Sequence, residues 1–181
     1  MIRTQDIQTI LELMELKVEA CGFLLFDDKE LDNILYIDSV SNNASASNEK
    51  RASCTLSKYT EIIWHTHPFN HKSYPSTEDI LKILKIRKDN LPKISLIFTN
   101  WGIWQLYAGK KDYIIINLDK YIQKELDRLY FNTQKGRAKF DLLIQNQIDT
   151  FIKNIEELCE KYELHIKFTS WKEVENGYVI T

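Results

Sequence analysis

Two histidines and an aspartate lie close together in the sequence, at positions that suit metal binding. His65 and His67 are one residue apart at the end of a short apolar run. In an extended strand, side chains two residues apart share a face and are about 6.6 Å apart at the backbone. Imidazoles at this spacing can converge on one ion at Zn–N distances of about 2.0–2.1 Å. Asp79 can add a third ligand, leaving one tetrahedral position for water, as in catalytic zinc sites.

The elements around these residues favour that geometry. Residues 61–64 are apolar and predict a strand that leads into the histidine pair. Pro68 ends the pairing of this strand, because proline has no N–H to donate. After a polar loop, Ser76 suits the N-cap position of a helix that runs to about residue 89. Asp79 then lies in the first turn of that helix.

Further helix and strand patterns surround this unit and predict an α/β or α+β domain with a central sheet. Apolar residues recur at helical spacing over residues 5–16. A stretch rich in Ser, Asn and Ala, residues 41–49, predicts a surface loop. Short apolar runs predict the remaining strands, at residues 19–26, 34–40, 94–99, 102–107 and 113–118.

The last third of the chain has a different pattern. Residues 119–131 and 138–162 predict two helices, and the second carries a continuous apolar stripe at steps of three or four residues. A strand or hairpin is expected over residues 166–181. We therefore predict a catalytic domain over residues 1–118 and a C-terminal extension over residues 119–181. The extension packs on the domain or forms a homodimer through its helices.

Composition and charge exclude several classes of protein. With 26 acidic and 24 basic side chains the net charge is -2, so no nucleic-acid-binding surface is expected. No apolar run approaches the roughly 20 residues needed to span a membrane, and the first residues lack signal-peptide features. Cys21, Cys54 and Cys159 are odd in number and widely spaced. They predict reduced thiols and a cytoplasmic location.

Three separated features together resemble the signature of the JAMM, or MPN-plus, family of zinc metalloproteases. They are Glu19 in the setting Glu-Ala-Cys-Gly, the His-Thr-His-Pro run at 65–68 and the Ser-Thr-Glu-Asp run at 76–79. The resemblance covers about residues 5–118. It implies a cytidine-deaminase-like fold, which is a curved mixed β-sheet flanked by helices. The deaminases' own signature and the His-Glu-x-x-His protease motif are both missing from the sequence.

The resemblance also implies chemical roles for five residues. His65, His67 and Asp79 are similar to the family's ligands for one Zn²⁺ ion with a bound water. Glu19 resembles the general base, and Ser76 resembles the hydroxyl that steadies the oxyanion. Zinc lowers the pKa of bound water from about 15.7 to about 7. A positioned carboxylate base is worth roughly 10²–10⁴ in rate.

Simpler interpretations of these residues stay open. Glu19 alone is typical of an acid at an exposed strand edge. Ser76 alone is typical of an N-cap with no further role. His71, in the loop after the histidine pair, is an alternative fourth ligand, although a catalytic site needs an open position. Eight residues separate His67 from Ser76, one more than the usual family pattern, and the loop can absorb the extra residue.

The implied activity is hydrolysis of a peptide or isopeptide bond that releases ubiquitin or a ubiquitin-like modifier from a conjugate. One alternative is a peptidase that acts on a sulfur-carrier-like protein or a cell-wall peptide. Another is a non-catalytic scaffold of MPN type that binds protein partners. The expected partner is thus a ubiquitin-type conjugate, with no nucleic acid and no membrane. The abundance of Ile, Lys and Asn suits an AT-rich genome, and for a viral protein the host cytoplasm is the expected location.

Overall fold

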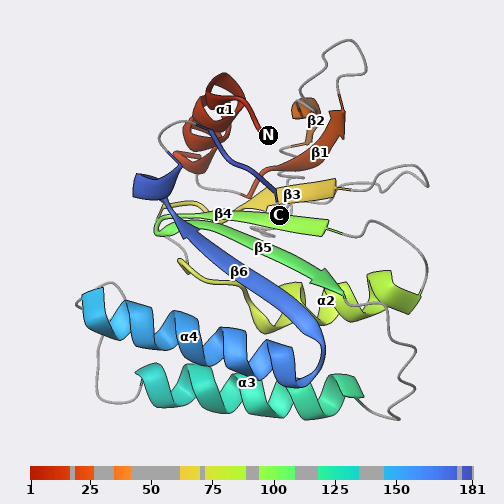
Figure 1. Cartoon of the computed structure of the whole chain (residues 1–181), viewed down its shortest axis with the longest axis vertical. Coiled ribbons are helices and arrows are strands. Elements are labelled where there is room, and N and C mark those ends of the chain that lie inside the picture. Colours follow the sequence, from red (N-terminus) through yellow and green to blue (C-terminus); the bar gives the residue numbers. More distant parts are fainter. Residues whose placement is uncertain are drawn as a thin grey trace.

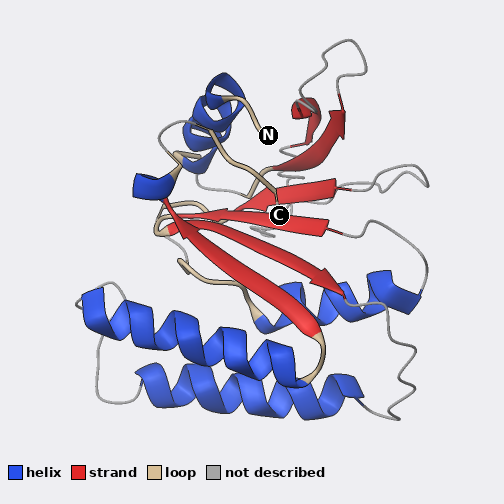
Figure 2. Cartoon of the chain, viewed as in Figure 1, coloured by secondary structure: helices blue, strands red, loops and turns tan. Residues whose placement is uncertain are grey.

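The described part of the chain forms one mixed β-sheet with helices on both faces (Figures 1 and 2). The structure is a computed structural model that describes residues 1–16, 19–26, 35–41, 62–69, 72–88, 94–108, 118–134, 145–174 and 177–180. In chain order the elements are α1 (Thr4–Met14), β1 (Cys21–Phe26), β2 (Leu35–Ser41), β3 (Ile62–Thr66), α2 (Thr77–Lys88), β4 (Ile94–Thr99), β5 (Gly102–Ala108), α3 (Leu118–Gln134), α4 (Gln145–Lys161), β6 (Leu164–Ser170) and the short 3₁₀ helix η2 (Trp171–Glu173).

The six strands lie side by side in the order β2-β1-β3-β4-β5-β6 (Figure 1). β3 and β4 are parallel, and α2 lies in the crossover between them, as a parallel pair requires. Each of the other neighbouring pairs in this sheet is antiparallel. β3 is therefore held by hydrogen bonds along both of its edges, to β1 and to β4. This confirms the mixed α/β class, whereas the cytidine-deaminase-like fold stays a prediction.

Side chains alternate along β3, and each face of the sheet packs against a different layer. Ile62 and Trp64 belong to the buried cluster that includes α1, whereas Ile63 belongs to the cluster that includes α2, α3 and α4. Figure 2 shows α1 on one side of the sheet and the other three helices on the opposite side. Because side chains alternate with a period of two, His65 points to the face with the three helices.

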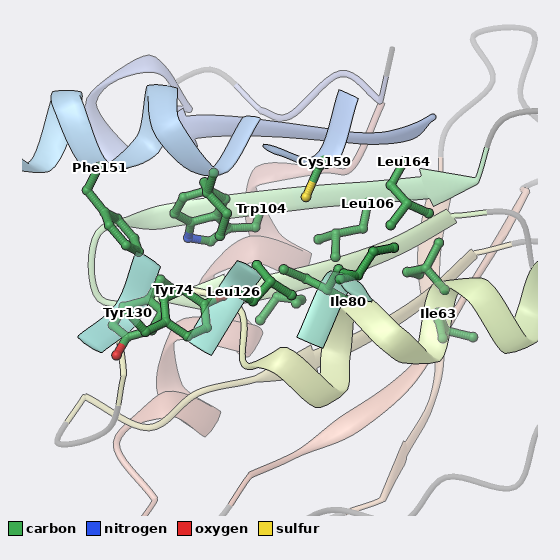
Figure 3. Packing of buried hydrophobic residues seen from close by; sticks show 14 residues of the cluster. Ile63, Tyr74, Ile80, Trp104, Leu106, Leu126, Tyr130, Phe151, Cys159 and Leu164 are labelled. Carbon is green, nitrogen blue, oxygen red and sulfur yellow. The ribbon is translucent and has the colours of Figure 1, made fainter. Parts of the chain in front are cut away.

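The described residues after position 118 join this same sheet and one of its helical layers. β6 pairs with β5 over the full length of both strands, from Gly102 opposite Ser170 to Ala108 opposite Leu164. Side chains of α3 and α4 lie in one buried cluster with those of β3, α2 and β5 (Figure 3). The segment predicted as an extension thus shares a sheet and a core with the segment predicted as the catalytic domain.

Several predicted boundaries differ from the structure. Leu118 was expected to end a strand but begins α3, because a short apolar run does not distinguish strand from helix. The rest of that predicted strand, residues 113–117, lies outside the described residues, as do residues 138–144 of the predicted long helix. The last strand begins at Leu164, two residues before its predicted start, and pairs with β5.

The prediction of three reduced thiols is wrong for Cys21, which is disulfide-bonded. Sequence spacing does not show which sulfur atoms approach one another, and that approach decides whether a disulfide forms. Cys159 in α4 is free and buried, and burial raises the pKa of its thiol to about 12. Cys54 lies outside the described residues. The cysteines therefore give no argument for a reducing compartment. No helix in the described ranges is long and apolar enough to cross a bilayer.

Candidate metal centre

His65 and His67 reach the same side of the sheet because the backbone stays extended through both residues. His67 follows the end of β3, but its N–H still donates to the carbonyl of Phe98 in β4 at 2.8 Å. Thr66 between them is fully buried and, by the alternation of a strand, points to the opposite face. The two imidazole centroids are 5.3 Å apart. The spacing of two residues thus brings the rings together, as the sequence predicts.

Asp79 is fixed by the first turn of α2. The N–H and the hydroxyl of Ser76 both donate to Asp79 Oδ2, at 2.7 and 2.6 Å. In return, the N–H of Asp79 donates to Ser76 Oγ at 3.2 Å. This reciprocal arrangement is a capping box with an aspartate in the third helical position, where the helix dipole also favours a negative charge. Ser76 therefore caps the helix, as its position in the sequence predicts.

The three predicted ligands converge on one point. His65 Nε2 lies 3.3 Å from Asp79 Oδ1, and His67 Nε2 lies 3.4 Å from Asp79 Oδ2. One ligand atom from each residue lies within 4.8 Å of the other two. Ligands about 2.0–2.1 Å from a zinc ion at tetrahedral angles are about 3.3–3.4 Å from one another. Each of the two separations is close to this edge, one through each carboxylate oxygen of Asp79, so the three side chains could hold one metal ion.

Charge and burial hold these groups in a state that suits a cation. Side-chain exposure is only 15% for His65, 6% for His67 and 17% for Asp79. Burial raises the pKa of Asp79, but the charges and hydrogen bonds of the two histidines outweigh it and hold the pKa well below its ordinary value. Burial lowers the pKa of His67, but the hydrogen bond and charge of Asp79 raise it further, so the net pKa is raised. A bound metal cation would take the place of the proton that this pair attracts.

The loop after β3 orients the ring of His67. Its Nδ1 lies 2.9 Å from the carbonyl oxygen of Lys72. A carbonyl only accepts hydrogen bonds, so Nδ1 carries the proton and Nε2 is left facing Asp79. Metal-binding histidines commonly donate their second ring N–H to a carbonyl or carboxylate, which fixes the tautomer and the ring orientation. The Lys72 carbonyl would fill that role if His67 binds a metal.

Glu19 directly precedes a residue that makes close contacts with the segment carrying the histidines. Its negative charge makes a small contribution to the raised pKa of His67. Thr66 donates its N–H to the Ala20 carbonyl at 2.8 Å, and Ala20 donates its N–H to Thr66 Oγ1 at 2.9 Å. The predicted base is therefore tied, through its neighbour, to the segment that carries the histidines.

Not every predicted role has a counterpart in this geometry. The Ser76 hydroxyl donates to Asp79, so its role in steadying an oxyanion stays a prediction. His71, the alternative fourth ligand, lies outside the described residues. The sequence reasoning missed two supports of the centre, Thr66 and the Lys72 carbonyl. The position of Thr66 between two histidines was a usable signal, whereas a backbone carbonyl leaves none in the sequence.

No protein-family model matches the sequence, and no curated protein matches it. The assignment of the metal centre therefore rests on the geometry of His65, His67 and Asp79 and on the chemistry of these side chains. The resemblance to the JAMM family rests on the motif residues alone, and what it implies about activity belongs to the proposal that follows.

Proposed function

We propose that this protein is a zinc-dependent metallohydrolase of JAMM type that cleaves a peptide or isopeptide bond. The observation that carries the proposal is the approach of Asp79 to His65 Nε2 and His67 Nε2, at 3.3 and 3.4 Å. Two neutral nitrogens and one carboxylate are a donor set found in catalytic zinc sites, where three protein ligands leave a fourth position open. A structural zinc site would use a fourth protein ligand instead.

Each residue around the centre has a separate role in the proposed amide hydrolysis. Zinc held by the three ligands would supply an acidified water and would polarise the substrate carbonyl. The Glu19 carboxylate takes the proton of the attacking water and passes it to the leaving amine. The water oxygen forms a bond to the carbonyl carbon, and the carbon–nitrogen bond breaks. The motif resemblance assigns Ser76 the role of steadying the charge on the carbonyl oxygen, for which its hydroxyl would turn from Asp79 to the substrate.

The proposed substrate is a lysine side chain conjugated to ubiquitin or a ubiquitin-like modifier. The motif resemblance supports this choice, because an early glutamate, a His-x-His-Pro run and a Ser-x-x-Asp run occur together in the JAMM signature, with one more residue than usual between His67 and Ser76 here. A peptidase acting on a sulfur-carrier-like protein or a cell-wall peptide would use the same centre. The difference between these substrates lies outside the metal centre, so a substrate panel must separate them.

The test is incubation of zinc-loaded protein with a panel of di-ubiquitin linkages, modifier–amide reporters, sulfur-carrier-like conjugates and cell-wall peptides. Glu19→Gln should keep its zinc and lose roughly 10²–10⁴ in turnover, because the base is lost while the ligands stay. Glu12→Gln, on the exposed side of α1, is the matched control and should keep full turnover. Full turnover by Glu19→Gln would show that another group is the base.

The remaining outcomes separate the alternatives. Cleavage of only small carrier or cell-wall substrates would replace the deubiquitinase assignment and keep the hydrolase. A wild-type protein that holds zinc but cleaves no member of the full panel would remove the hydrolase. A wild-type protein that holds no zinc would favour the non-catalytic scaffold of MPN type, because such a scaffold needs no ligands.

A further inference from the structure

The segment that joins the two halves of the metal centre is held by side chains from distant elements. Residues 72–76 run from the carbonyl that orients His67 to the serine that caps α2. Trp104 in β5 donates its Nε1–H to the carbonyl of Ser73 at 3.1 Å. Tyr130 in α3 donates its hydroxyl to the carbonyl of Pro75 at 2.6 Å, across 55 residues of sequence. Both hydrogen bonds are buried, so they hold the loop on the side that faces the core.

Aromatic rings enclose the middle residue of this segment. The ring of Tyr74, which is almost fully buried, lies 4.9 Å from the ring of Tyr130 and 5.1 Å from that of Phe151, measured between centroids. Figure 3 shows these three side chains together at one end of the cluster. Trp101 adds a ring at 6.3 Å. The loop between the ligands thus packs against α3 and α4, which follow it in the chain.

We propose that Tyr130 is a positioning residue for the metal centre, acting through Pro75 and Ser76 on Asp79. Pro75 directly precedes Ser76, and the N–H and hydroxyl of Ser76 hold Asp79 Oδ2. A shift of the Pro75 peptide therefore moves the N–H and the hydroxyl of Ser76, which hold the carboxylate of Asp79 in position. The inference rests on the proposed zinc centre and extends it, because it makes zinc affinity depend on a hydroxyl in α3.

The position of Tyr130 distinguishes it from a residue that only fills the core. The residue is only 7% exposed, and its hydroxyl donates to a backbone carbonyl that belongs to no helix or strand. A buried carbonyl without a donor is costly, so loss of the hydroxyl favours a shift of the loop toward water. Groups that orient a metal ligand without touching the ion typically affect metal affinity by about 10–100-fold.

The test compares Tyr130→Phe with Tyr162→Phe in the full chain. Tyr162, just after α4, also donates its hydroxyl at 2.6 Å, but to Glu125 in α3, in a partly buried contact away from the loop that joins the ligands. The zinc dissociation constant is measured by competition with a chromophoric chelator. Stability of the metal-free proteins is measured by urea unfolding. We expect Tyr130→Phe to weaken zinc binding by about tenfold and Tyr162→Phe to leave it unchanged.

A second variant is included in case Tyr130→Phe has a folding defect. Phe151→Leu loosens the packing of Tyr74 from α4 but removes no hydrogen-bonding group, and we expect it to weaken zinc binding by a smaller factor. Equal zinc affinity of wild type and Tyr130→Phe would overturn the inference and leave the metal centre standing. Equal weakening by Tyr130→Phe and Tyr162→Phe would also overturn it, because general stability would then be the cause. A wild type that binds no zinc would overturn both proposals.

Discussion

Two serine–acid turns in this protein have nearly the same local geometry in different surroundings. At the start of α2, Ser76 donates its N–H and hydroxyl to Asp79 at 2.7 and 2.6 Å. At the start of η2, Ser170 donates its N–H and hydroxyl to Glu173 at 2.8 and 2.6 Å. Both are capping boxes, in which a serine and an acid three residues later satisfy backbone groups at a helix start. Local geometry does not separate them.

Their surroundings separate them completely. Glu173 is exposed, and the hydrogen bonds from Ser170 lower the pKa of its carboxyl. Asp79 is largely buried, and its carboxylate faces His65 and His67, which hold its pKa well below the ordinary value against the opposing effect of burial. The capping box therefore fixes a carboxylate, and a neighbouring strand that brings two imidazoles converts it into a candidate ligand. Tertiary context, not the cap, gives the chemistry.

Removal of the two carboxylates should give the largest contrast between the turns. Asp79→Asn keeps the shape of the side chain but loses the anionic ligand. We expect its zinc affinity to fall by more than the roughly 100-fold typical of losing a group that only orients a ligand. Glu173→Gln should bind zinc as tightly as wild type. A chelator competition measures both, and wild-type affinity in Asp79→Asn would contradict its role as a ligand.

Removal of the two serine hydroxyls should give a smaller contrast. Ser76→Ala loses a helix cap and a donor to Asp79, so we expect about 1 kcal/mol lower unfolding free energy in the metal-free protein. Zinc affinity should also fall by about tenfold, because the carboxylate is less well aimed. Ser170→Ala should lose no more stability than this and no zinc affinity. Equal zinc affinity of both variants would mean that the cap does not orient Asp79.

The ligand-bearing elements could be predicted from sequence because their signals are local. The apolar run before the histidines predicted a strand at residues 61–64, and the structure has β3 at Ile62–Thr66. The N-cap at Ser76 predicted the start of a helix, and α2 runs from Thr77 to Lys88. A period of two and a cap each depend on neighbouring residues, so one sequence is enough to identify them.

The long-range supports of the centre could not be predicted, because they join distant parts of the chain. The pairing of β6 with β5 and the hydrogen bond from Tyr130 to Pro75 depend on the order of strands in the sheet. No spacing or periodicity carries this information. The predicted boundary between domain and extension at residue 118 was placed where the sequence pattern changes. In the structure, the pairing of β5 with β6 crosses that boundary.

The most direct test of the central claim is the zinc content of the purified, zinc-equilibrated protein, measured by elemental analysis. The account predicts one zinc ion per wild-type chain. It predicts none in a His65→Ala/His67→Ala double variant that still shows the wild-type circular dichroism spectrum, because two of the three ligands are gone. A wild-type chain without zinc, or a double variant that retains the same zinc content, would contradict it.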